Sequence, residues 1–238
     1  MNFKPGIITQ ARMGSTRLPG KIFLTAGNKT LLEHHVDRIS WSGYDATIAC
    51  TEDPKDDEIF LFCKKKELNC YRDDEKNVLK RFYETAKYFK FDPVVRVTSD
   101  CPLIDGNLIR QGIEAWKEAG DGTYVSNVTD RSFPRGFDFE VFSFAMLEDA
   151  FKNAKTGPQR EHVTPYIREI AKNILHIKHH EDASRFRLTV DEKEDHELIK
   201  KIIEEYNADI MSAEEIIELM MRSPELESIN KHIRQKET

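Results

Sequence analysis

The sequence predicts an α/β fold built on a mostly parallel sheet, and three observations lead to this expectation. The first half of the chain alternates short apolar runs with segments whose apolar residues recur at helical spacing. The run at 94–98, Val-Val-Arg-Val-Thr, is almost continuously apolar, as in strands that helices cover on both faces. The chain has 238 residues, 39% of them hydrophobic, which is enough for one substantial core. Strands and helices that alternate in this way form parallel sheets with right-handed crossovers.

In the first half, the expected helices have recognisable starts. Thr30 precedes Glu33 by three residues, the spacing of a capping box at a helix N-terminus. Asp53 precedes Pro54, and proline suits the first turn of a helix. We expect strands at 7–8, 46–50, 70–71 and 94–98, and helices at 31–39, 54–68 and 78–86.

The second half is less regular, and its elements follow from alternation and helical spacing. We expect strands at 123–127, 137–141, 175–177 and 186–190, and helices after Ser143, over 158–172 with a break near Pro165, over 194–206 and over 212–221. These elements predict one domain over 1–222, with a small inserted β-rich lobe at about 126–180. The charged tail at 223–238 is expected to be loosely held.

Composition excludes several classes of protein. The formal net charge of −6 at pH 7 argues against general affinity for nucleic acids, so any basic site must be local. No apolar run reaches the length of a membrane span, and the N-terminus leads directly into the first expected strand without a signal peptide. The four cysteines show no C-x-x-C pairing, which predicts reduced thiols and argues against zinc. We therefore expect a cytoplasmic protein.

The segment 10–21, Gln-Ala-Arg-Met-Gly-Ser-Thr-Arg-Leu-Pro-Gly-Lys, follows the first expected strand. Its last ten residues hold three cationic side chains, two glycines and two hydroxyls. That mixture suits a loop that wraps a polyphosphate, because glycines admit close approach of the backbone and fixed charges offset the anion. The alternative is an ordinary basic surface loop. The spacing matches neither G-x-x-x-x-G-K-[ST] nor G-x-G-x-x-G.

Two aspartates follow expected strands. Asp100 follows the strand at 94–98, and ligands in such sheets bind beyond the carboxyl ends of the strands, where the 10–21 segment also lies. A carboxylate beside a phosphate loop is a natural Mg²⁺ ligand. Asp191 is a second candidate, after the expected strand at 186–190. Both aspartates have an alternative interpretation as helix caps or turn residues.

Further polar clusters lie in the second half. Asp138 and Glu140 share one face of an expected strand, where they could bind a metal, hydroxyls or an amine, or could form a solvated edge face. Arg160 and Thr164 are one helical turn apart, and His162 between them has the alternative of an ordinary surface residue.

The segment after the first strand resembles the nucleotidyltransferases that make CMP-activated acidic sugars. Every fixed position of their signature A-R-x-x-S-x-R-x-P-G-K is present, at Ala11, Arg12, Ser15, Arg17, Pro19, Gly20 and Lys21. The variant of the signature found here is most similar to the spore-coat polysaccharide biosynthesis branch. Asp100 matches the D-x-P-L segment of the family, and Asp191 matches the first aspartate of its V/I-D-x-x-x-D segment, with Asp195 as second choice.

The resemblance implies a Rossmann-like sheet of the nucleotide-diphospho-sugar transferase type. It also implies a Mg²⁺-dependent cytidylyltransferase that couples CTP to an acidic sugar, such as a 2-keto acid, and gives a CMP-sugar and pyrophosphate. Mg²⁺ would be held by Asp100 and Asp191, and Lys21, Arg17 and Asp100 would be catalytic. The implied nucleotide-binding residues are Ala11, Arg12, Met13, Gly14, Ser15, Arg17, Lys21, Arg81 and Asp100.

In the spore-coat branch, a G-x-D-x-E segment and an E-H-V-T segment recur, and both are present here. By resemblance, the acceptor pocket is lined by Asn127, Arg135, Asp138, Glu140, Arg160, Glu161 and His162. Related enzymes form homodimers through the lobe that corresponds to 126–180. The phenylalanines of this region could supply such an interface, or could belong to the core of the lobe.

Two other functions stay open. On the same fold, the chain could be a glycosyltransferase, or a nucleotidyltransferase for a non-sugar phosphate acceptor. A glycosyltransferase usually needs a D-x-D motif, which the sequence does not complete. A nucleotide sensor without catalysis is the third possibility, although the joint presence of the basic segment and both aspartates argues against it. The acceptor itself cannot be named from the sequence.

Overall fold

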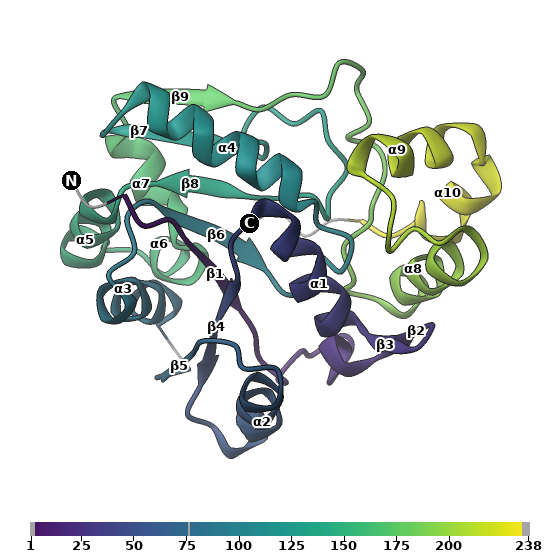
Figure 1. Cartoon of the computed structure of the whole chain (residues 1–238), viewed down its shortest axis with the longest axis horizontal. Helices are drawn as coiled ribbons and strands as arrows, with labels where there is room; N and C mark the ends of the chain where they lie inside the picture. The colour runs from purple at the N-terminus through teal and green to yellow at the C-terminus, as the bar shows by residue number, and fades with distance from the viewer. Residues whose placement is uncertain (1–2, 76, 235–238) are drawn as a thin grey trace.

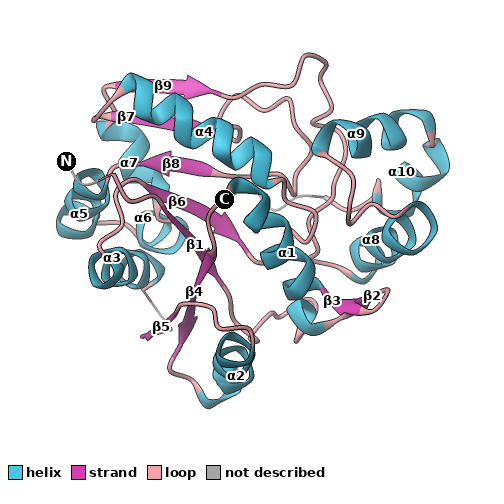
Figure 2. Ribbon diagram, in the orientation of Figure 1, coloured by secondary structure: helices cyan, strands magenta, loops and turns pink. Residues whose placement is uncertain are grey.

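The computed structural model describes residues 3–75 and 77–234, and arranges them as helices on both faces of one seven-stranded sheet (Figures 1 and 2). The strand order is β5-β4-β1-β6-β8-β7-β9. In chain order, the strands of this sheet are β1 (Gly6–Gln10), β4 (Ala46–Thr51), β5 (Cys70–Asp73), β6 (Val94–Thr98), β7 (Thr123–Ser126), β8 (Glu140–Phe142) and β9 (Asn173–His176).

The sheet is parallel except for one strand. β5, β4, β1 and β6 pair in parallel, and β7 pairs in parallel with β9. β8 is antiparallel to both of its neighbours, β6 and β7. The expectation of a mostly parallel sheet is confirmed, and the carboxyl ends of β1 and β6 lie side by side, with Gln10 opposite Thr98.

One of the two predicted helix starts is found as expected, whereas Asp53 and Pro54 begin a short 3-10 turn, Pro54–Asp56, before the helix Asp57–Lys65. The Thr30 hydroxyl accepts a hydrogen bond from the backbone N–H of Glu33, and the Glu33 carboxylate accepts one from the backbone N–H of Thr30. The expected capping box is therefore present. The helices are α1 (Leu31–Ile39), α2 (Asp57–Lys65), α3 (Val78–Phe89), α4 (Gly106–Ala119), α5 (Phe144–Asn153), α6 (Gly157–His162), α7 (Thr164–Ile170), α8 (Lys193–Tyr206), α9 (Ala213–Arg222) and α10 (Pro224–Asn230). The expected break near Pro165 falls at Val163, which has φ of 68° between α6 and α7.

The core divides along the two faces of the sheet. Successive strand residues point to opposite faces, so Ile7 packs with α1, α2 and α4, whereas Ile8 packs with α3, α5 and α7. A third cluster of apolar residues lies among α8, α9 and α10, which gather at one end of the molecule near β2 (Thr25–Ala26) and β3 (Lys29–Thr30) (Figure 1). This third cluster places the C-terminal helices beside the edge of the sheet where ligands bind in such folds.

The expected strand at 186–190 is wrong. The segment makes a single bridge, between Arg187 and Arg135, and its apolar residues Leu188 and Val190 pack into the C-terminal helical cluster. The alternation in the sequence therefore reflects packing against helices rather than pairing in a sheet. Gly136 makes this approach possible, because a Cβ there would lie 2.6 Å from the backbone of Leu188.

The start of the tail is also more ordered than expected. Residues 224–230 form α10, with Leu226 buried among the C-terminal helices and Asn230 buried against residue 187. The region 126–180 contributes β8 and β9 to the main sheet and carries α5, α6 and α7. The boundaries of the domain and of the lobe stay predictions. Within the described ranges, no helix combines the length and the apolar character needed to cross a bilayer.

Candidate active site

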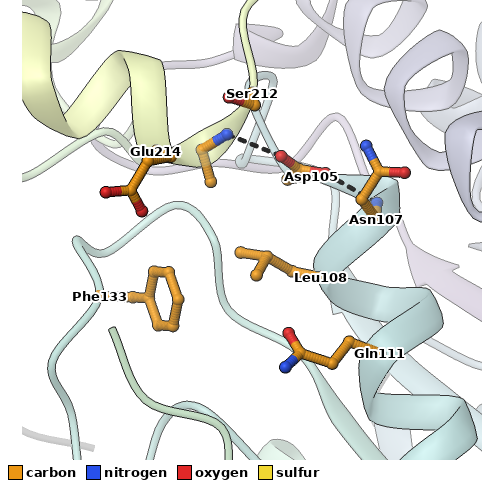
Figure 3. Close-up of a pocket in the computed structure, with 8 residues that line it drawn as sticks. Asp105, Asn107, Leu108, Gln111, Phe133, Ser212 and Glu214 are labelled. Carbon is orange, nitrogen blue, oxygen red and sulfur yellow. Dashed lines mark hydrogen bonds between the residues drawn. The ribbon is translucent and has the colours of Figure 1, made fainter. Parts of the chain in front are cut away.

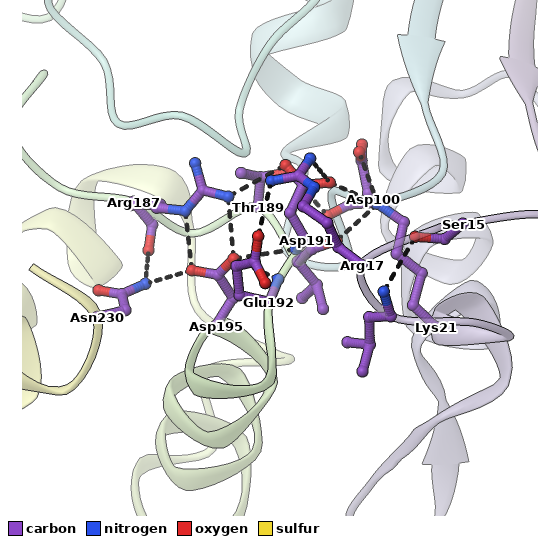
Figure 4. A network of polar contacts seen from close by, with 12 residues as sticks. Ser15, Arg17, Lys21, Asp100, Arg187, Thr189, Asp191, Glu192, Asp195 and Asn230 are labelled. Carbon is purple, nitrogen blue, oxygen red and sulfur yellow. Dashed lines mark hydrogen bonds and ion pairs between the residues drawn. The ribbon is translucent and has the colours of Figure 1, made fainter. Parts of the chain in front are cut away.

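Three segments that are distant in the chain meet beyond the carboxyl ends of β1 and β6 (Figure 4). The first is the basic loop at 11–21 that follows β1. The second is Asp100, just after β6. The third is the turn at 187–195 that leads into α8. Contacts between these segments join residues 79 to 175 positions apart, so the site exists only in the folded chain.

Lys21 lies at the centre of this meeting point. Its Nζ donates to Asp100 Oδ2 at 3.1 Å, to Asp191 Oδ1 at 2.9 Å and to the carbonyl oxygen of Val190 at 2.7 Å. The side chains of Lys21, Asp100 and Asp191 are 13%, 25% and 12% exposed, so the cluster is sheltered but open to solvent on one side. The structure thus brings together the three groups that the sequence places at one edge of the sheet.

The charges of this cluster stabilise one another. Burial alone lowers the pKa of Lys21, but the carboxylates of Asp100 and Asp191 outweigh it, and the pKa is raised. Burial alone raises the pKa of Asp100, but the Lys21 ammonium and hydrogen bonds to the carboxylate lower it to about 2. Both groups are therefore charged at neutral pH.

Arg17 extends the cluster to the start of α8. Its guanidinium contacts Asp191 Oδ1 at 2.9 Å and Glu192 Oε1 at 3.1 Å. Asp191 is therefore shared by two cations of the basic loop, and Arg187 contacts its other oxygen at 3.1 Å. The Lys21 ammonium and the Arg17 guanidinium both contact Asp191, and two cations this close together suit a highly charged anion.

Asp195 anchors the segment that carries Arg187, Asp191 and Glu192. It is fully buried, and its carboxylate accepts from Arg187 at 2.8 and 2.9 Å and from the backbone N–H groups of Asp191 and Glu192. Asn230 of α10 donates to the same carboxylate and to the carbonyl of Arg187, both at 2.9 Å. Asp195 as the second choice of metal ligand stays a prediction, and in the structure its oxygens are engaged within the fold. Sequence analysis missed Asn230, since no local pattern marks it.

The basic loop is fixed by its own backbone and by a residue that sequence reasoning missed. Met13 N–H donates to Asp56 Oδ1 at 2.7 Å, and Asp56 is buried at the start of α2. The N–H of Gly20 donates to the carbonyl of Met13 at 3.2 Å, which folds the loop back on itself. Gly20 has φ of 67°, a conformation that favours glycine. Ala11 is buried at the base of the loop.

Several polar groups of the loop stay available. Ser15 Oγ accepts from Leu18 N–H at 3.3 Å, and Arg12 is half exposed with Glu75 3.9 Å away. Among the residues that the structure describes, the N–H groups of Arg12, Gly14 and Thr16 find no protein acceptor. Main-chain N–H groups in such a loop form a concave site for anions.

Arg81 of α3 is an unusual feature near the loop. It is fully buried, and only its Nη1 is paired, to the carbonyl of Asp74 at 2.9 Å. Its Nε and Nη2 have no partner in the described parts of the chain. Burial lowers the pKa of Arg81, and the neighbouring charge of Arg12 adds to this. Buried donors without acceptors are costly unless a ligand pairs with them.

The expected acceptor residues fall into two groups, of which the first lies beside Asp100. Asp138 pairs with Arg131 through two contacts, of 2.6 and 2.8 Å. Burial raises the pKa of the Cys101 thiol, and the nearby carboxylates of Asp100 and Asp138 raise it further, so both charges lie close to that residue. Within residues 3–75 and 77–234, the half-buried Arg135 guanidinium forms no ion pair, and burial together with Arg131 lowers its pKa.

Two expected acceptor residues are engaged inside the fold. Glu140 is buried, and its carboxylate accepts from Arg96 at 2.5 Å and from the hydroxyl of Tyr124. Asn127 is buried, with its amide bonded to the backbone of residues 137 and 139 at 2.7 and 3.0 Å. Both residues support the segment that carries Asp138. Their direct contact with an acceptor stays a prediction.

The second group lies on α6, which packs beside α3. Arg160 donates to the carbonyl of Ala154 at 3.3 Å, Glu161 is exposed and His162 is partly exposed. In the described part of the chain, none of these three side chains forms a hydrogen bond or ion pair with Lys21, Asp100 or Asp138. The structure therefore does not bring them to the cluster around Lys21.

His35 lies beneath the site and was not anticipated there. Its Nδ1 is 2.8 Å from the carbonyl of Cys101, and its Nε2 is 3.0 Å from the hydroxyl of Thr9. Complete burial lowers the pKa of His35 to about 4, despite the opposing effect of the Cys101 carbonyl and Asp100. A neutral imidazole therefore fixes the turn that carries Asp100.

Comparison with known proteins gives consistent results. A family model described as cytidylyltransferase matches residues 6–236. The spore coat polysaccharide biosynthesis protein SpsF of Bacillus subtilis is 34% identical over 231 residues, which cover 92% of this chain and 94% of that protein.

Two solved structures have the same fold. A cytidylyltransferase of Leptospira borgpetersenii serovar Hardjo-bovis has a TM-score of 0.90 at 31% identity, over 99% of this chain and 100% of that chain. A CMP:2-keto-3-deoxy-manno-octonic acid synthetase, complexed with CTP, has a TM-score of 0.65 at 14% identity, over 85% of this chain and 99% of that chain. The expected Rossmann-like fold of the nucleotidyltransferase type is confirmed.

Proposed function

This chain belongs to the cytidylyltransferase family, and we propose that it couples CTP to an acidic sugar of a surface polysaccharide, giving a CMP-sugar and pyrophosphate. One relative by fold is named as a synthetase for CMP:2-keto-3-deoxy-manno-octonic acid, and another relative is named for spore coat polysaccharide biosynthesis. The first name supports an acidic sugar as the acceptor, and the second supports a role in making a surface polysaccharide.

The observation that carries the proposal is the position of Lys21 between Asp100 and Asp191. An ammonium group that bridges two carboxylates can exchange them for phosphate oxygens when a nucleotide and a cation arrive together. Arg17 and Arg12 belong to the same loop, and its N–H groups that find no acceptor among the described residues add further donors. We propose that this loop holds the triphosphate, with Ala11, Met13, Gly14 and Ser15 forming its walls.

The family resemblance also implies Mg²⁺, and the residues present fit this ion. The carboxylates of Asp100 and Asp191 converge on one point, where the Lys21 ammonium contacts an oxygen of each at 3.1 and 2.9 Å. Mg²⁺ prefers one or two carboxylates together with phosphate oxygens and water. When bound, the ion would neutralise phosphate charge and polarise the reacting phosphorus.

In the reaction we propose, an acceptor oxygen attacks the α-phosphorus of CTP. A new P–O bond forms to the acceptor, and the bond to the pyrophosphate oxygen breaks. Lys21 and Arg17 stabilise the charge that develops on the leaving pyrophosphate, and Arg17 can bind two oxygens at once. Catalysis then comes from positioning and from charge neutralisation, with Asp100 holding Lys21 in place before the substrate arrives.

The cytosine base and the acceptor would bind on opposite sides of the cluster around Lys21. We propose that the two unpaired donors of buried Arg81 face the nucleotide. On the other side, Arg135 is the half-buried cation without a partner in the described ranges, beside the Arg131–Asp138 pair. We propose that Arg135 receives the carboxylate of the acceptor and that Asp138 binds its hydroxyls. Arg160, Glu161 and His162 would complete the acceptor pocket only if α6 moves or a second copy contributes them.

We also propose a homodimer formed through the region 126–180 and a cytoplasmic location. Strand β9 is one of the two edge strands of the sheet, and Ile174 and Leu175 on it are 41% and 37% exposed. The four cysteines are free thiols, which fits a reducing compartment. Light scattering at micromolar concentration tests the dimer, and a monomer there would contradict it.

The direct test mixes the protein with CTP, Mg²⁺ and a panel of 2-keto-acid sugars and measures released pyrophosphate. We expect release with CTP and one member of the panel, and little release with ATP, GTP or UTP in place of CTP. Omission of Mg²⁺ should abolish it. No release and no CTP binding with any acceptor would contradict the proposal, and preferential binding of a UDP-sugar would favour a glycosyltransferase instead.

A further inference from the structure

A second polar cluster lies away from the basic loop, at the junction of the segment after β9 with the start of α9. It contains two adjacent histidines, His179 and His180, and Glu214. One ligand atom from each of the three lies within 4.8 Å of the others. His179 Nε2 is 2.9 Å from Glu214 Oε2, and His180 Nδ1 is 3.7 Å from Glu214 Oε1. The histidines and the glutamate come from segments about 35 residues apart, so folding assembles the cluster.

The hydrogen bonds of His179 define which of its nitrogens faces Glu214. Its Nδ1 lies 2.8 Å from the carbonyl oxygen and 3.2 Å from the backbone nitrogen of Glu181, so Nδ1–H can donate to the carbonyl or Nδ1 can accept from the N–H group. When Nδ1–H donates, Nε2 presents a lone pair beside Glu214, as a metal ligand does. When Nδ1 accepts, Nε2–H donates to Glu214 Oε2 at 2.9 Å without an ion. A carbonyl that fixes the outer nitrogen of a histidine is typical of metal-binding histidines.

The surroundings hold His179 in this orientation. Its side chain is 3% exposed, its backbone N–H donates to Ser132 Oγ at 2.7 Å, and its ring packs edge-on against Phe133 at 5.4 Å. Phe133 and Glu214 lie on two sides of a cavity of about 230 Å³ between α4 and α9 (Figure 3). His180 and Glu214 are 67% and 48% exposed. The cluster thus has one rigid buried member and two members that an ion can reach from solvent.

We propose that His179, His180 and Glu214 form a site for a transition-metal ion of the zinc type. Bonds of about 2.0–2.1 Å in a tetrahedral geometry put neighbouring ligand atoms roughly 3.4 Å apart. The ligand atoms lie within 4.8 Å of one another, with His179 Nε2 2.9 Å from Glu214 Oε2 and His180 Nδ1 3.7 Å from the other oxygen, Oε1. Rotation of the exposed His180 and Glu214 side chains would bring both nitrogens and one oxygen to this spacing. Three protein ligands leave one position for water. The spacing of the cysteines argues against zinc, but this site uses imidazole and carboxylate ligands from two segments.

The ligand set separates this site from the one at Asp100. Imidazole nitrogens favour Zn²⁺, Co²⁺, Ni²⁺ and Cu²⁺, whereas Mg²⁺ and Ca²⁺ prefer oxygen ligands. An ion held here joins the segment after β9 to α9. Because it binds the folded chain, it stabilises the packing of the C-terminal helices by mass action. The inference does not depend on the proposed transfer reaction.

The test is a titration of the full chain, without a histidine tag, with Co²⁺ and Zn²⁺ in excess Mg²⁺, which occupies the oxygen site. We expect one saturating equivalent by calorimetry, a visible Co²⁺ spectrum with the intensity of a four-coordinate ion, and a rise in Tm with Zn²⁺. The exposed variants His180→Ala and Glu214→Gln should bind at least tenfold more weakly while keeping the Tm of the metal-free protein. Both variants retain the buried His179 ring, so we expect them to fold like the unmodified chain.

His232→Ala is the matched control. His232 is also exposed and lies 3.8 Å from Glu194, but it belongs to no cluster of three ligands in the described part of the chain. It should bind Co²⁺ like the unmodified protein. The proposal is overturned if the unmodified chain binds no Co²⁺ or Zn²⁺ in excess Mg²⁺, or if His180→Ala and Glu214→Gln bind them as tightly as it does. In either case His179 and Glu214 form only a hydrogen-bonded pair.

Discussion

Two clusters of charged residues flank β6, and they differ in what holds them. Beyond the carboxyl end of the strand, Lys21 bridges Asp100 and Asp191, and none of the three residues belongs to a strand of the sheet. Within the sheet, Glu140 of β8 accepts from Arg96 of β6 and Tyr124 of β7. Glu140 is 4% exposed at its side chain, whereas Asp100 is 25% exposed.

The difference shows how a ligand site is distinguished from a structural ion pair. In the sheet, the pairing of β6 with β8 puts Arg96 opposite Glu140, so the backbone sets the geometry and the Glu140 carboxylate is almost fully buried. In the loops, two cations share Asp191 and an open side remains, so incoming phosphates can replace existing contacts. We therefore expect the loop cluster to carry activity and the sheet cluster to carry stability. Four predictions test this division.

The largest effect is expected for Lys21→Ala. Loss of the ammonium removes charge stabilisation of the leaving pyrophosphate, and kcat should fall by about a thousandfold. The free energy of unfolding should fall less than in Glu140→Ala, because Arg17 and solvent can still compensate the two carboxylates. Lys29→Ala is the control, since Lys29 pairs with Asp37 at 2.8 Å in an exposed position. Steady-state pyrophosphate release gives kcat. Equal turnover in both variants would show that Lys21 does not stabilise the leaving pyrophosphate.

Glu140→Ala should have the opposite profile. It leaves Arg96 and Tyr124 without their acceptor in a buried position, and the free energy of unfolding should fall by about 3–4 kcal/mol. Glu148→Ala, at an exposed ion pair with Lys152, should cost less than about 0.5 kcal/mol. Urea unfolding measures both. A fully stable Glu140→Ala with reduced acceptor binding would instead make Glu140 a direct acceptor ligand.

His35 predicts a pH dependence of stability. In the folded chain its pKa is about 4, against 6.5 for the exposed group, so the unfolded chain binds more protons between these values. Its contribution is therefore complete above pH 6.5 and is lost as the pH falls toward 4. Between pH 7 and 4.5 this loss amounts to roughly 2–3 kcal/mol.

The variant His35→Asn isolates this contribution. Asparagine keeps a donor for the carbonyl of Cys101 but has no group that takes up a proton. Urea unfolding at pH 7 and 4.5 should show a smaller loss of stability in the variant than in the unmodified chain. Equal losses in both would show that His35 is not held neutral.

The smallest effect is expected for Asn230→Ala. The variant removes two hydrogen bonds that α10 makes to Asp195 and to the backbone of Arg187, and should lower the free energy of unfolding by about 1–2 kcal/mol. Because Arg187 and Asp195 hold Asp191, the KM for CTP should rise a few-fold. Asn173→Ala, at an exposed position of β9, is the control. An unchanged KM for CTP would show that α10 does not support the nucleotide site.

The sequence predicts the parts of the molecule that local patterns encode. The capping box of Thr30 and Glu33 and the buried strand at 94–98 are found as expected, and the signature at 11–21 leads to the correct edge of the sheet. The positions of Lys21 and Asp100 follow, because both lie after neighbouring parallel strands.

The support of the site could not be predicted, because it depends on contacts between distant segments. Met13 is fixed by Asp56, 43 residues away, and Asp195 by Asn230, 35 residues away, and neither pair leaves a local pattern. The alternation at 186–190 is ambiguous, because packing against helices produces the same period as a strand. Helical spacing likewise places His35 on a buried stripe without showing that its ring reaches Cys101.

The proposed activity requires the nucleotide to bind where the basic loop, Asp100 and Asp191 converge. A crystal structure of the protein with a non-hydrolysable CTP analogue and Mg²⁺ tests this most directly. We predict a triphosphate in contact with Lys21 and Arg17 and an ion coordinated by Asp100 and Asp191. A nucleotide bound elsewhere, with the Lys21 ammonium still seated between the two carboxylates, would contradict the account.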